Sequence, residues 1–508
     1  MHSSVFLRAP LARLLAASCL TLAGFVGPAA TPASGEEEAR DKKLTLVETN
    51  SSDQPRRTPV TREAMKQYLE DLKDRTPRIP LPPLTDEEKA SESANPNPFG
   101  YESRLRKHYL GDAPNAYLTF GGMPPGGFPG LSRSVRAQPQ DEKLSLDYGF
   151  KVRMFWIAAR ANNCQYCLGH QESKLLAVGM TDDEIAALDF AWEQFPQKEQ
   201  VAFQLAKRLT LQPYLLTAQD LEACRPFYND LQLIEMLGSI AGNNAINRWK
   251  EGIGVPQMRD GGNFGRTGKN EHSSYLTKTS DKFAEKRSSV TAYDQERVSL
   301  LGGSLTMCVR PPLERGEALA SRLRETETRK PRLPLLDEAA TREVLGEVAG
   351  KGPLPQWQRL LAHFPVAGKR LIAGVAASQK SDELSPRLQA EIDWVVARQD
   401  RAWYLTAIAL RDLRAAGVEE AAIEGLDGDL GQPQAALAPR DQALLLVAKN
   451  LAASPIVLTD AQVAKAVELA GPRAVAQVIN YTCYRAALNR ITEAAGLSTE
   501  TDAAASSR

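Results

Sequence analysis

The feature that most constrains the fold of this 508-residue chain is that the sequence repeats itself. Residues 77–81 (PRIPL) recur as 331–335 (PRLPL), and residues 156–160 (WIAAR) recur as 394–398 (WVVAR). The offset between the copies is 254 residues at the first match and 238 at the second, and it settles at 242 near the end, as small loop insertions would produce. Self-similarity at this scale predicts a duplicated structural unit. Further matches in the same register are Tyr166 with Tyr404, Gly179 with Gly417, Lys207 with Lys449, Asn247-Arg248 with Asn489-Arg490, and Gly254 with Gly496.

The repeat predicts how the chain is divided into domains. Its two copies delimit a domain over 77–256 and a second over 331–497, as expected for a chain too long for a single core. The segment between them is rich in Gly, Ser, Thr and charged residues and is interpreted as a connector with one helix near 313–326. The remaining segments are a signal peptide (1–33), a polar and mobile N-terminal extension (34–76), the connector itself (257–330) and a polar tail (498–508).

Within each copy, the apolar residues follow a helical period. The segment 231–250 places Leu231, Ile234, Leu237 and Ile240 at spacings of three, and 199–211 behaves in the same way. Alternating strand patterns are scarce. The sequence therefore predicts an all-α fold with one helical bundle per repeat, the two bundles being joined by the long connector.

The N-terminus and the charge balance limit the environment and the partners of the protein. Arg8 and Arg13 precede an apolar run from Leu14 to Val26, which is typical of a secretory signal that is cleaved after small residues. This predicts an exported protein, periplasmic or extracellular; an uncleaved anchor and a lipoprotein signal at Cys19 are the alternatives. Basic and acidic residues both number 62, which argues against a nucleic-acid partner.

The chemistry is concentrated in the first copy, in the stretch Cys164-Gln-Tyr-Cys167-Leu-Gly-His170. With Asn162 and Asn163 as N-cap residues, a helix is predicted from about 164 to 178, with both thiols on one face and His170 close to that face. A helix N-terminus stabilises a thiolate, and a neighbouring imidazole can accept its proton. The second copy has Ala402, Leu405 and Ile408 at the matching positions, so these three residues are not needed to build the bundle.

The residues around this motif, WIAARANNCQYCLGHQESKLLAVGM with NAINRWKEGIGVP further on, resemble the carboxymuconolactone decarboxylase / alkyl hydroperoxidase D (AhpD)-like family. The resemblance implies an all-helical, oligomeric thiol peroxidase or thiol-disulfide oxidoreductase without a cofactor, acting on a peroxide or disulfide and reduced by an extracytoplasmic thiol. It makes Cys167 the peroxidatic and Cys164 the resolving cysteine, whereas general Cys-x-x-Cys chemistry gives the lower pKa to the first thiol. It also implies a homo-oligomer, or an intrachain pseudo-dimer of the two repeats.

Two departures from the family pattern leave other interpretations open. His170 lies three residues after the second cysteine rather than four, and Val152 stands where the family has a relay glutamate, with Asp147 and Glu172 as possible substitutes. The alternatives are a zinc site, a static disulfide, and a non-catalytic binding or structural protein with a fossil site. Outside the motif, Cys224 and Cys483 are predicted to be buried apolar residues. Asn243-Asn244 is predicted to form a surface turn of helix, with a place facing the site as the alternative.

Overall fold

Amphipathic helices account for the regular structure of the chain in the computed structural model, which describes residues 53–84, 86, 99–111, 120, 141–258, 274–291 and 312–499. Within these ranges there is no strand, only an isolated bridge between Thr61 and Arg287, and the all-α prediction is confirmed. The predicted signal peptide and the polar tail beyond 499 lie outside the described residues. No described helix is long and apolar enough to cross a membrane.

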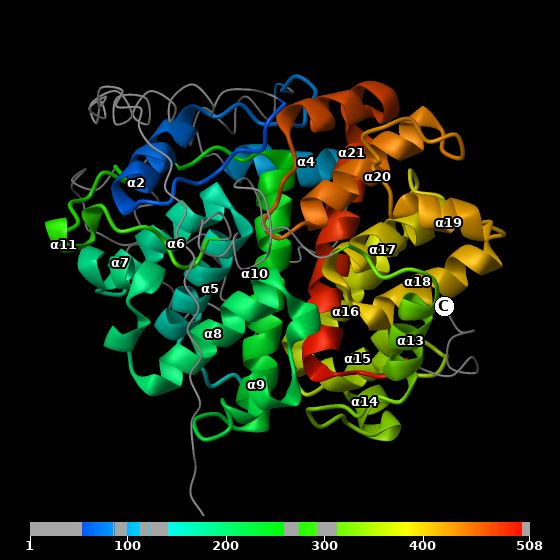
Figure 1. Ribbon diagram of the computed structural model, residues 1–508, viewed down its shortest axis with the longest axis horizontal. Helices are drawn as coiled ribbons and strands as arrows, with labels where there is room; N and C mark the ends of the chain where they lie inside the picture. Colours follow the sequence, from blue (N-terminus) through cyan, green and yellow to red (C-terminus); the bar gives the residue numbers. More distant parts are fainter. Residues whose placement is uncertain are drawn as a thin grey trace, which may run out of the picture. The chain divides into compact units, whose positions relative to one another are not determined.

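Residues up to 284 contribute one set of helices, shown in blue to green in Figure 1. Short 3₁₀ turns separate several of them, for example Leu72–Asp74 and Pro213–Leu215. The helices are α2 (Arg62–Asp71), α4 (Phe99–Tyr109), α5 (Tyr148–Asn162), α6 (Gln165–Ala177), α7 (Asp182–Phe190), α8 (Gln197–Leu211), α9 (Ala218–Glu222), α10 (Asp230–Ile253) and α11 (Asp281–Ala284).

The later residues contribute a second set, from yellow-green to red in Figure 1. The helix predicted near 313–326 is α13. The set comprises α13 (Gly316–Glu327), α14 (Glu338–Leu345), α15 (Gln356–Leu361), α16 (Pro365–Gln379), α17 (Pro386–Asp400), α18 (Trp403–Ala415), α19 (Glu420–Leu426), α20 (Pro439–Ala452) and α21 (Asp460–Ala495).

Helix α21 is two helices joined at a kink. Gly471 has φ 83° and ψ 158°, and Pro472 follows it. A proline cannot donate an intrahelical hydrogen bond but suits the first turn of a helix, so the second part starts there. In the register of the repeat, Gly471 matches Asn229, the N-cap of α10. The second part of α21 therefore corresponds in sequence to α10, which it packs against.

Matched positions of the two copies have the same local backbone. Asn163 ends α5 with φ 63°, and its match Arg401 ends α17 with φ 50°; they are the only non-glycine residues with positive φ among those described. Gly254 and Gly496 end α10 and α21 with φ 69° and 62°. These similarities fit the predicted duplication, which stays a prediction. The predicted domain boundaries also stay a prediction, because residues 51–508 form one compact unit by their internal contacts.

Helices α10 and α21 each carry a buried arginine that donates a hydrogen bond to a backbone carbonyl of the other half. Arg248 donates from Nη2 to the carbonyl of Ala452 at 2.8 Å, and Arg490 donates from Nη2 to the carbonyl of Thr210 at 3.0 Å. Thr210 and Ala452 are themselves a matched pair in the repeat register. Both arginines also donate to Ser454 Oγ, at 2.8 and 2.9 Å. Such mutual contacts are the pattern of a two-fold interface.

In its described part, the N-terminal extension forms the packed helix α2, and its expected mobility stays a prediction. Helix α2 lies against α6, and its residues Arg62 and Lys66 are buried. Arg62 donates to both carboxylate oxygens of Glu172, at 2.8 and 2.6 Å. Despite the polar composition of this segment, Met65 and Leu69 of α2 belong to the hydrophobic core, and charged residues of α2 have partners on other helices.

We expect Gly254→Ala to lower the free energy of unfolding by about 2 kcal/mol. An L-residue in the left-handed region costs roughly 1–2 kcal/mol, and the added Cβ would lie 2.8 Å from Arg78 Cγ. Gly179→Ala is the matched control, because Gly179 also has positive φ but nothing within 4 Å of the added Cβ. Equal losses in urea unfolding of the two variants would show that the contact with Arg78 contributes nothing.

Candidate functional site

The two cysteines lie where α5 ends and α6 begins. Asn163, in the left-handed conformation that asparagine tolerates, reverses the chain after α5. Its Oδ1 accepts hydrogen bonds from the backbone N–H and the hydroxyl of Thr58, at 2.8 and 2.9 Å. Cys164 is then the N-cap of α6. The prediction of Asn162 and Asn163 as N-cap residues is therefore wrong: they end the preceding helix, and the thiol itself caps the next one.

Cys164 and Cys167 are one helical turn apart and both buried, with 0% and 2% exposure. The Sγ of Cys164 accepts a hydrogen bond from the backbone N–H of Cys167 at 3.3 Å. Both are free thiols, as are the buried Cys224 and Cys483, whose predicted burial is confirmed. The sulfur of Cys164 thus occupies the place that a serine or aspartate oxygen takes at an ordinary N-cap.

The environment of Cys164 keeps this thiol protonated. Burial raises its pKa well above the usual value, and the neighbouring Cys167 thiol and Glu251 carboxylate raise it further. Glu251 accepts the backbone N–H of Gln165 at 3.0 Å and pairs with Arg75 Nη1 at 3.2 Å. The positive end of the helix macrodipole would stabilise a thiolate, but the Glu251 carboxylate already lies there and its negative charge opposes a second one.

His170 lies one turn after Cys167 and is partly exposed. Its ring stacks on Tyr166 with centroids 5.9 Å apart, and Lys250 Nζ lies 4.5 Å from the centroid of the Tyr166 ring. Burial lowers the pKa of His170 well below its usual range, and the charges of Lys174 and Lys250 lower it further. The imidazole is therefore neutral at pH 7, and its lowered pKa makes it a weaker proton acceptor than an exposed histidine.

The carboxylates of Asp147 and Glu172, the predicted substitutes for the relay glutamate, both already accept hydrogen bonds from other parts of the protein. Val152 is fully buried. Asp147 caps α5 by accepting the N–H of Phe150 at 2.8 Å. Glu172 is held by Arg62, and the indole N–H of Trp156 donates to it at 2.5 Å.

Glu251 is the carboxylate that sequence reasoning missed. The repeat register contained a signal for it, because Glu251 matches Glu493 and Arg75 matches Arg329. The second pair is present as well, with Arg329 Nη1 2.9 Å from Glu493 Oε2. The first ion pair joins the segment after α2 to α10, and the second joins the segment after α13 to α21.

Asn243 and Asn244 are buried, so their predicted place on a surface turn is wrong. Asn243 donates to the carbonyl of Phe155 at 3.3 Å. Asn244 donates to Thr210 Oγ1 at 3.1 Å and accepts from Asn162 Nδ2 at 2.7 Å. They tie α10 to α5 and α8 rather than facing solvent.

No group of three or more His, Cys, Asp or Glu residues within the described ranges is arranged to hold a metal ion. The thiols and His170 follow one another along α6, and the nearby carboxylate of Glu251 is already paired. Searches for related proteins found no matching family model and no matching curated protein.

The neutral His170 predicts a dependence of stability on pH. Because its pKa is depressed in the folded state, the unfolded chain binds a proton first as the pH falls below about 6.5. The free energy of unfolding should therefore decrease as the pH falls towards the folded-state pKa, by up to about 1.4 kcal/mol per pH unit. Urea unfolding of the wild type and His170→Gln between about pH 7 and 5 tests this. The variant should lose less stability on acidification, and identical pH profiles would contradict the assignment.

Proposed function

We propose that Cys164 and Cys167 are the redox-active dithiol of an exported thiol peroxidase or thiol-disulfide oxidoreductase of the AhpD-like type, with His170 as proton acceptor. The observation that carries the proposal is the placement of two free thiols at the N-cap and in the first turn of α6, followed one turn later by an imidazole. The second copy keeps the matching helix start at Ala402 without this chemistry.

The environment of Cys164 favours Cys167 as the attacking thiol. A protonated thiol is a weak nucleophile, and the pKa of Cys164 is raised. Cys167 transfers its proton to His170, and its sulfur attacks one peroxide oxygen. The O–O bond breaks, Cys167 becomes a sulfenic acid, and the leaving oxygen departs as water or an alcohol with the proton from His170.

The second step closes the disulfide. Cys164 sulfur attacks the sulfenic sulfur, and the hydroxyl leaves as water with the proton of the Cys164 thiol. An extracytoplasmic thiol reductant then supplies two electrons and two protons to reopen the S–S bond. The short distance along α6 means that no large rearrangement of the backbone is needed for the two sulfurs to meet.

The reciprocal contacts of Arg248 and Arg490 support an intrachain pseudo-dimer, in which the second repeat takes the place of a partner subunit. In this proposal, the second copy completes the packing surface of the first one. A further homo-oligomer of the whole chain remains compatible with it.

A non-catalytic role is the second candidate, and the burial of both thiols together with Glu251 at the helix N-terminus favours it. The reduction potential of the dithiol distinguishes the two candidates. A cycling pair should equilibrate with glutathione or dithiothreitol buffers at a potential above about −300 mV. A potential below that value would mean a static disulfide and would contradict the redox proposal.

A further inference from the structure

The imidazole of His170 belongs to a stack of side chains that comes from three helices. Its ring is nearly parallel to that of Tyr166, with 16° between the planes and 5.9 Å between the centroids. The Nζ atom of Lys250, on α10, lies over the Tyr166 ring, 4.5 Å from its centroid. On α4, the Glu102 carboxylate accepts a hydrogen bond from this ammonium group. The Tyr166 ring therefore contacts both the imidazole and the ammonium group.

The ion pair between Lys250 and Glu102 is buried and held on several sides. Each of the two side chains is 7% exposed. The Oε1 atom of Glu102 also accepts a hydrogen bond from the indole N–H of Trp249 at 2.6 Å and lies 3.5 Å from Arg106 Nε. The Arg106 guanidinium lies over the Trp249 ring, 4.2 Å from its centroid. These contacts fix the ammonium charge of Lys250 at one place beside the Tyr166 ring.

Two positive charges act on His170. Lys174 lies one turn further along α6, and Lys250 approaches from α10; both lower the pKa of the imidazole in addition to its burial. The other charged groups on the helices around α6 are held in ion pairs: Arg62 with Glu172, Lys66 with Asp182, and Arg75 with Glu251. A nearby ammonium group makes an imidazole a weaker base and the imidazolium a stronger acid. It therefore favours the transfer of the proton from His170 to the leaving oxygen.

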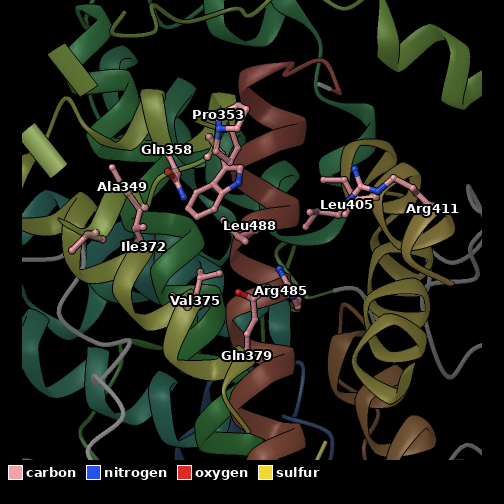
Figure 2. A pocket seen from close by; sticks show the side chains of 17 residues that line it. Ala349, Pro353, Gln358, Ile372, Val375, Gln379, Leu405, Arg411, Arg485 and Leu488 are labelled. Carbon is pink, nitrogen blue, oxygen red and sulfur yellow. The ribbon is translucent and has the colours of Figure 1, made fainter. Parts of the chain in front are cut away.

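In the register of the predicted repeat, the second half keeps the aromatic ring but neither the ammonium group nor the imidazole. Tyr404 matches Tyr166 and is fully buried. Thr492 stands in place of the lysine. Ile408 stands in place of the imidazole and lines a largely apolar cavity of about 200 Å³ (Figure 2). The ring is therefore common to both halves, whereas Lys250 occurs only together with the reactive residues.

We propose that Lys250 is a positioning residue for His170: held by Glu102 and acting through the Tyr166 ring, it fixes the imidazole and keeps it uncharged until Cys167 transfers its proton. This role rests on the proposed function, because that function gives His170 the proton of Cys167. The contacts of Lys250 with Tyr166 and Glu102 do not depend on it.

The first test is the pKa of His170 in the reduced, full-length protein. Its ring gives a ¹H NMR signal that His170→Gln identifies by its loss. The double variant Lys250→Met/Glu102→Gln removes both charges of the buried pair together, so that no unpaired charge is left in the interior. The pKa of His170 should then rise towards its usual value of about 6.5.

Two further variants separate the charge of Lys250 from its packing. Lys250→Thr installs the residue of the second half and leaves Glu102 bonded to Trp249, so the variant should fold and should also raise the pKa of His170. Lys250→Arg keeps the positive charge, and the pKa of His170 should stay below its usual range in this variant.

The second test is the pH dependence of the rate at which a hydroperoxide oxidises Cys167. Only the neutral imidazole can accept the thiol proton, so below the pKa of His170 the rate should fall about tenfold per pH unit. This acidic limb should move to higher pH in Lys250→Thr and in the double variant, and it should stay in place in Lys250→Arg. A merely structural role of Lys250 would lower the rate at every pH without moving the limb.

Lys207→Met is the matched control, because Lys207 Nζ also lies over an aromatic ring, 5.5 Å from the centroid of Trp192, but on α8. It should change neither the pKa of His170 nor the pH profile. The inference is overturned if His170 titrates as in the wild type in both Lys250→Thr and the double variant. It is also overturned if Lys250→Arg raises the pKa as much as they do, or if the acidic limb stays in place while the pKa moves.

Failure of this inference and failure of the proposed function can be told apart. A wild-type protein whose Cys167 does not react with hydroperoxide contradicts the proposed function, and with it the role of Lys250 in proton transfer. The NMR titration of His170 needs no turnover, so it still decides whether Lys250 acts on the imidazole.

Discussion

Replacing Cys167 with serine is expected to abolish hydroperoxide-driven oxidation of the protein, with a loss of roughly 10³-fold or more in rate, because the nucleophile is removed. Cys164→Ser should still react once but stop at the sulfenic acid, since the resolving thiol is missing. Mass spectrometry distinguishes the two outcomes: Cys167→Ser stays reduced, and Cys164→Ser gains one oxygen.

Cys224→Ser is the matched control for both variants. Cys224 is also a free, buried cysteine on the first half of the chain, but it belongs to no pair. It should therefore leave the rate of oxidation unchanged. Full activity in both Cys164→Ser and Cys167→Ser would contradict the proposed function, and a gain of oxygen on Cys164 rather than Cys167 would reverse their roles.

Arg490→Met should produce the largest loss of stability, about 3–5 kcal/mol in the free energy of unfolding. Arg490 Nη1 lies 2.9 Å from Asp400 Oδ2, and neither side chain is exposed. Among the described residues, the substitution leaves the buried Asp400 carboxylate with one side-chain donor, Asn489 Nδ2 at 3.0 Å. It also removes one of the two reciprocal contacts between the halves. Urea unfolding measures the loss.

A second substitution shows how much of the loss in stability comes from the unpaired Asp400 charge and how much from the lost contacts of Arg490. Asn162 stands in the first half where Asp400 stands in the second. The double variant Arg490→Met/Asp400→Asn should therefore recover part of the loss, because no buried charge remains. Arg473→Met is the control: Arg473 pairs with Asp382 in the open, at 48% and 61% exposure, so less than about 1 kcal/mol is expected. Equal losses for Arg490→Met and the control would contradict the structural role of the junction.

Helices could be predicted from the sequence where apolar residues recur at the helical period along one face. The segment 231–250 was predicted to be helical and lies inside α10, and 199–211 lies inside α8. A helix with a regular apolar stripe needs little tertiary information. Helix α2 in the N-terminal extension was missed although Met65, Leu69 and Leu72 form such a stripe and are buried. Its ion pair Arg62–Glu172, whose partners are 110 residues apart, could not be predicted in this way.

Of the candidate site, the sequence predicted the reactive residues but not the residues that surround them. The Cys-x-x-Cys-x-x-His spacing indicated the dithiol and the imidazole, and the structure places all three at the beginning of α6. The same spacing carries no information about Glu251 or Lys250, which reach the site from the end of α10. Glu251 raises the pKa of Cys164 and Lys250 lowers that of His170, so residues of α10 that lie far away in the sequence set the electrostatics of the motif.

In the register of the predicted repeat, residues of the scaffold can be told apart from the reactive residues. Arg160 pairs with Asp189, and Arg398 pairs with Asp427, in matched positions of the two halves. The ion pairs are therefore scaffold, whereas the thiols occur once.

The most direct test of the proposed function is the time course of disulfide formation in the reduced, purified protein at increasing concentrations of hydrogen peroxide and an organic hydroperoxide. The account predicts a Cys164–Cys167 disulfide that forms at a saturable rate and reopens with a mild dithiol. Oxidation that is no faster than that of a free cysteine, or that leaves these two thiols unpaired, would contradict it.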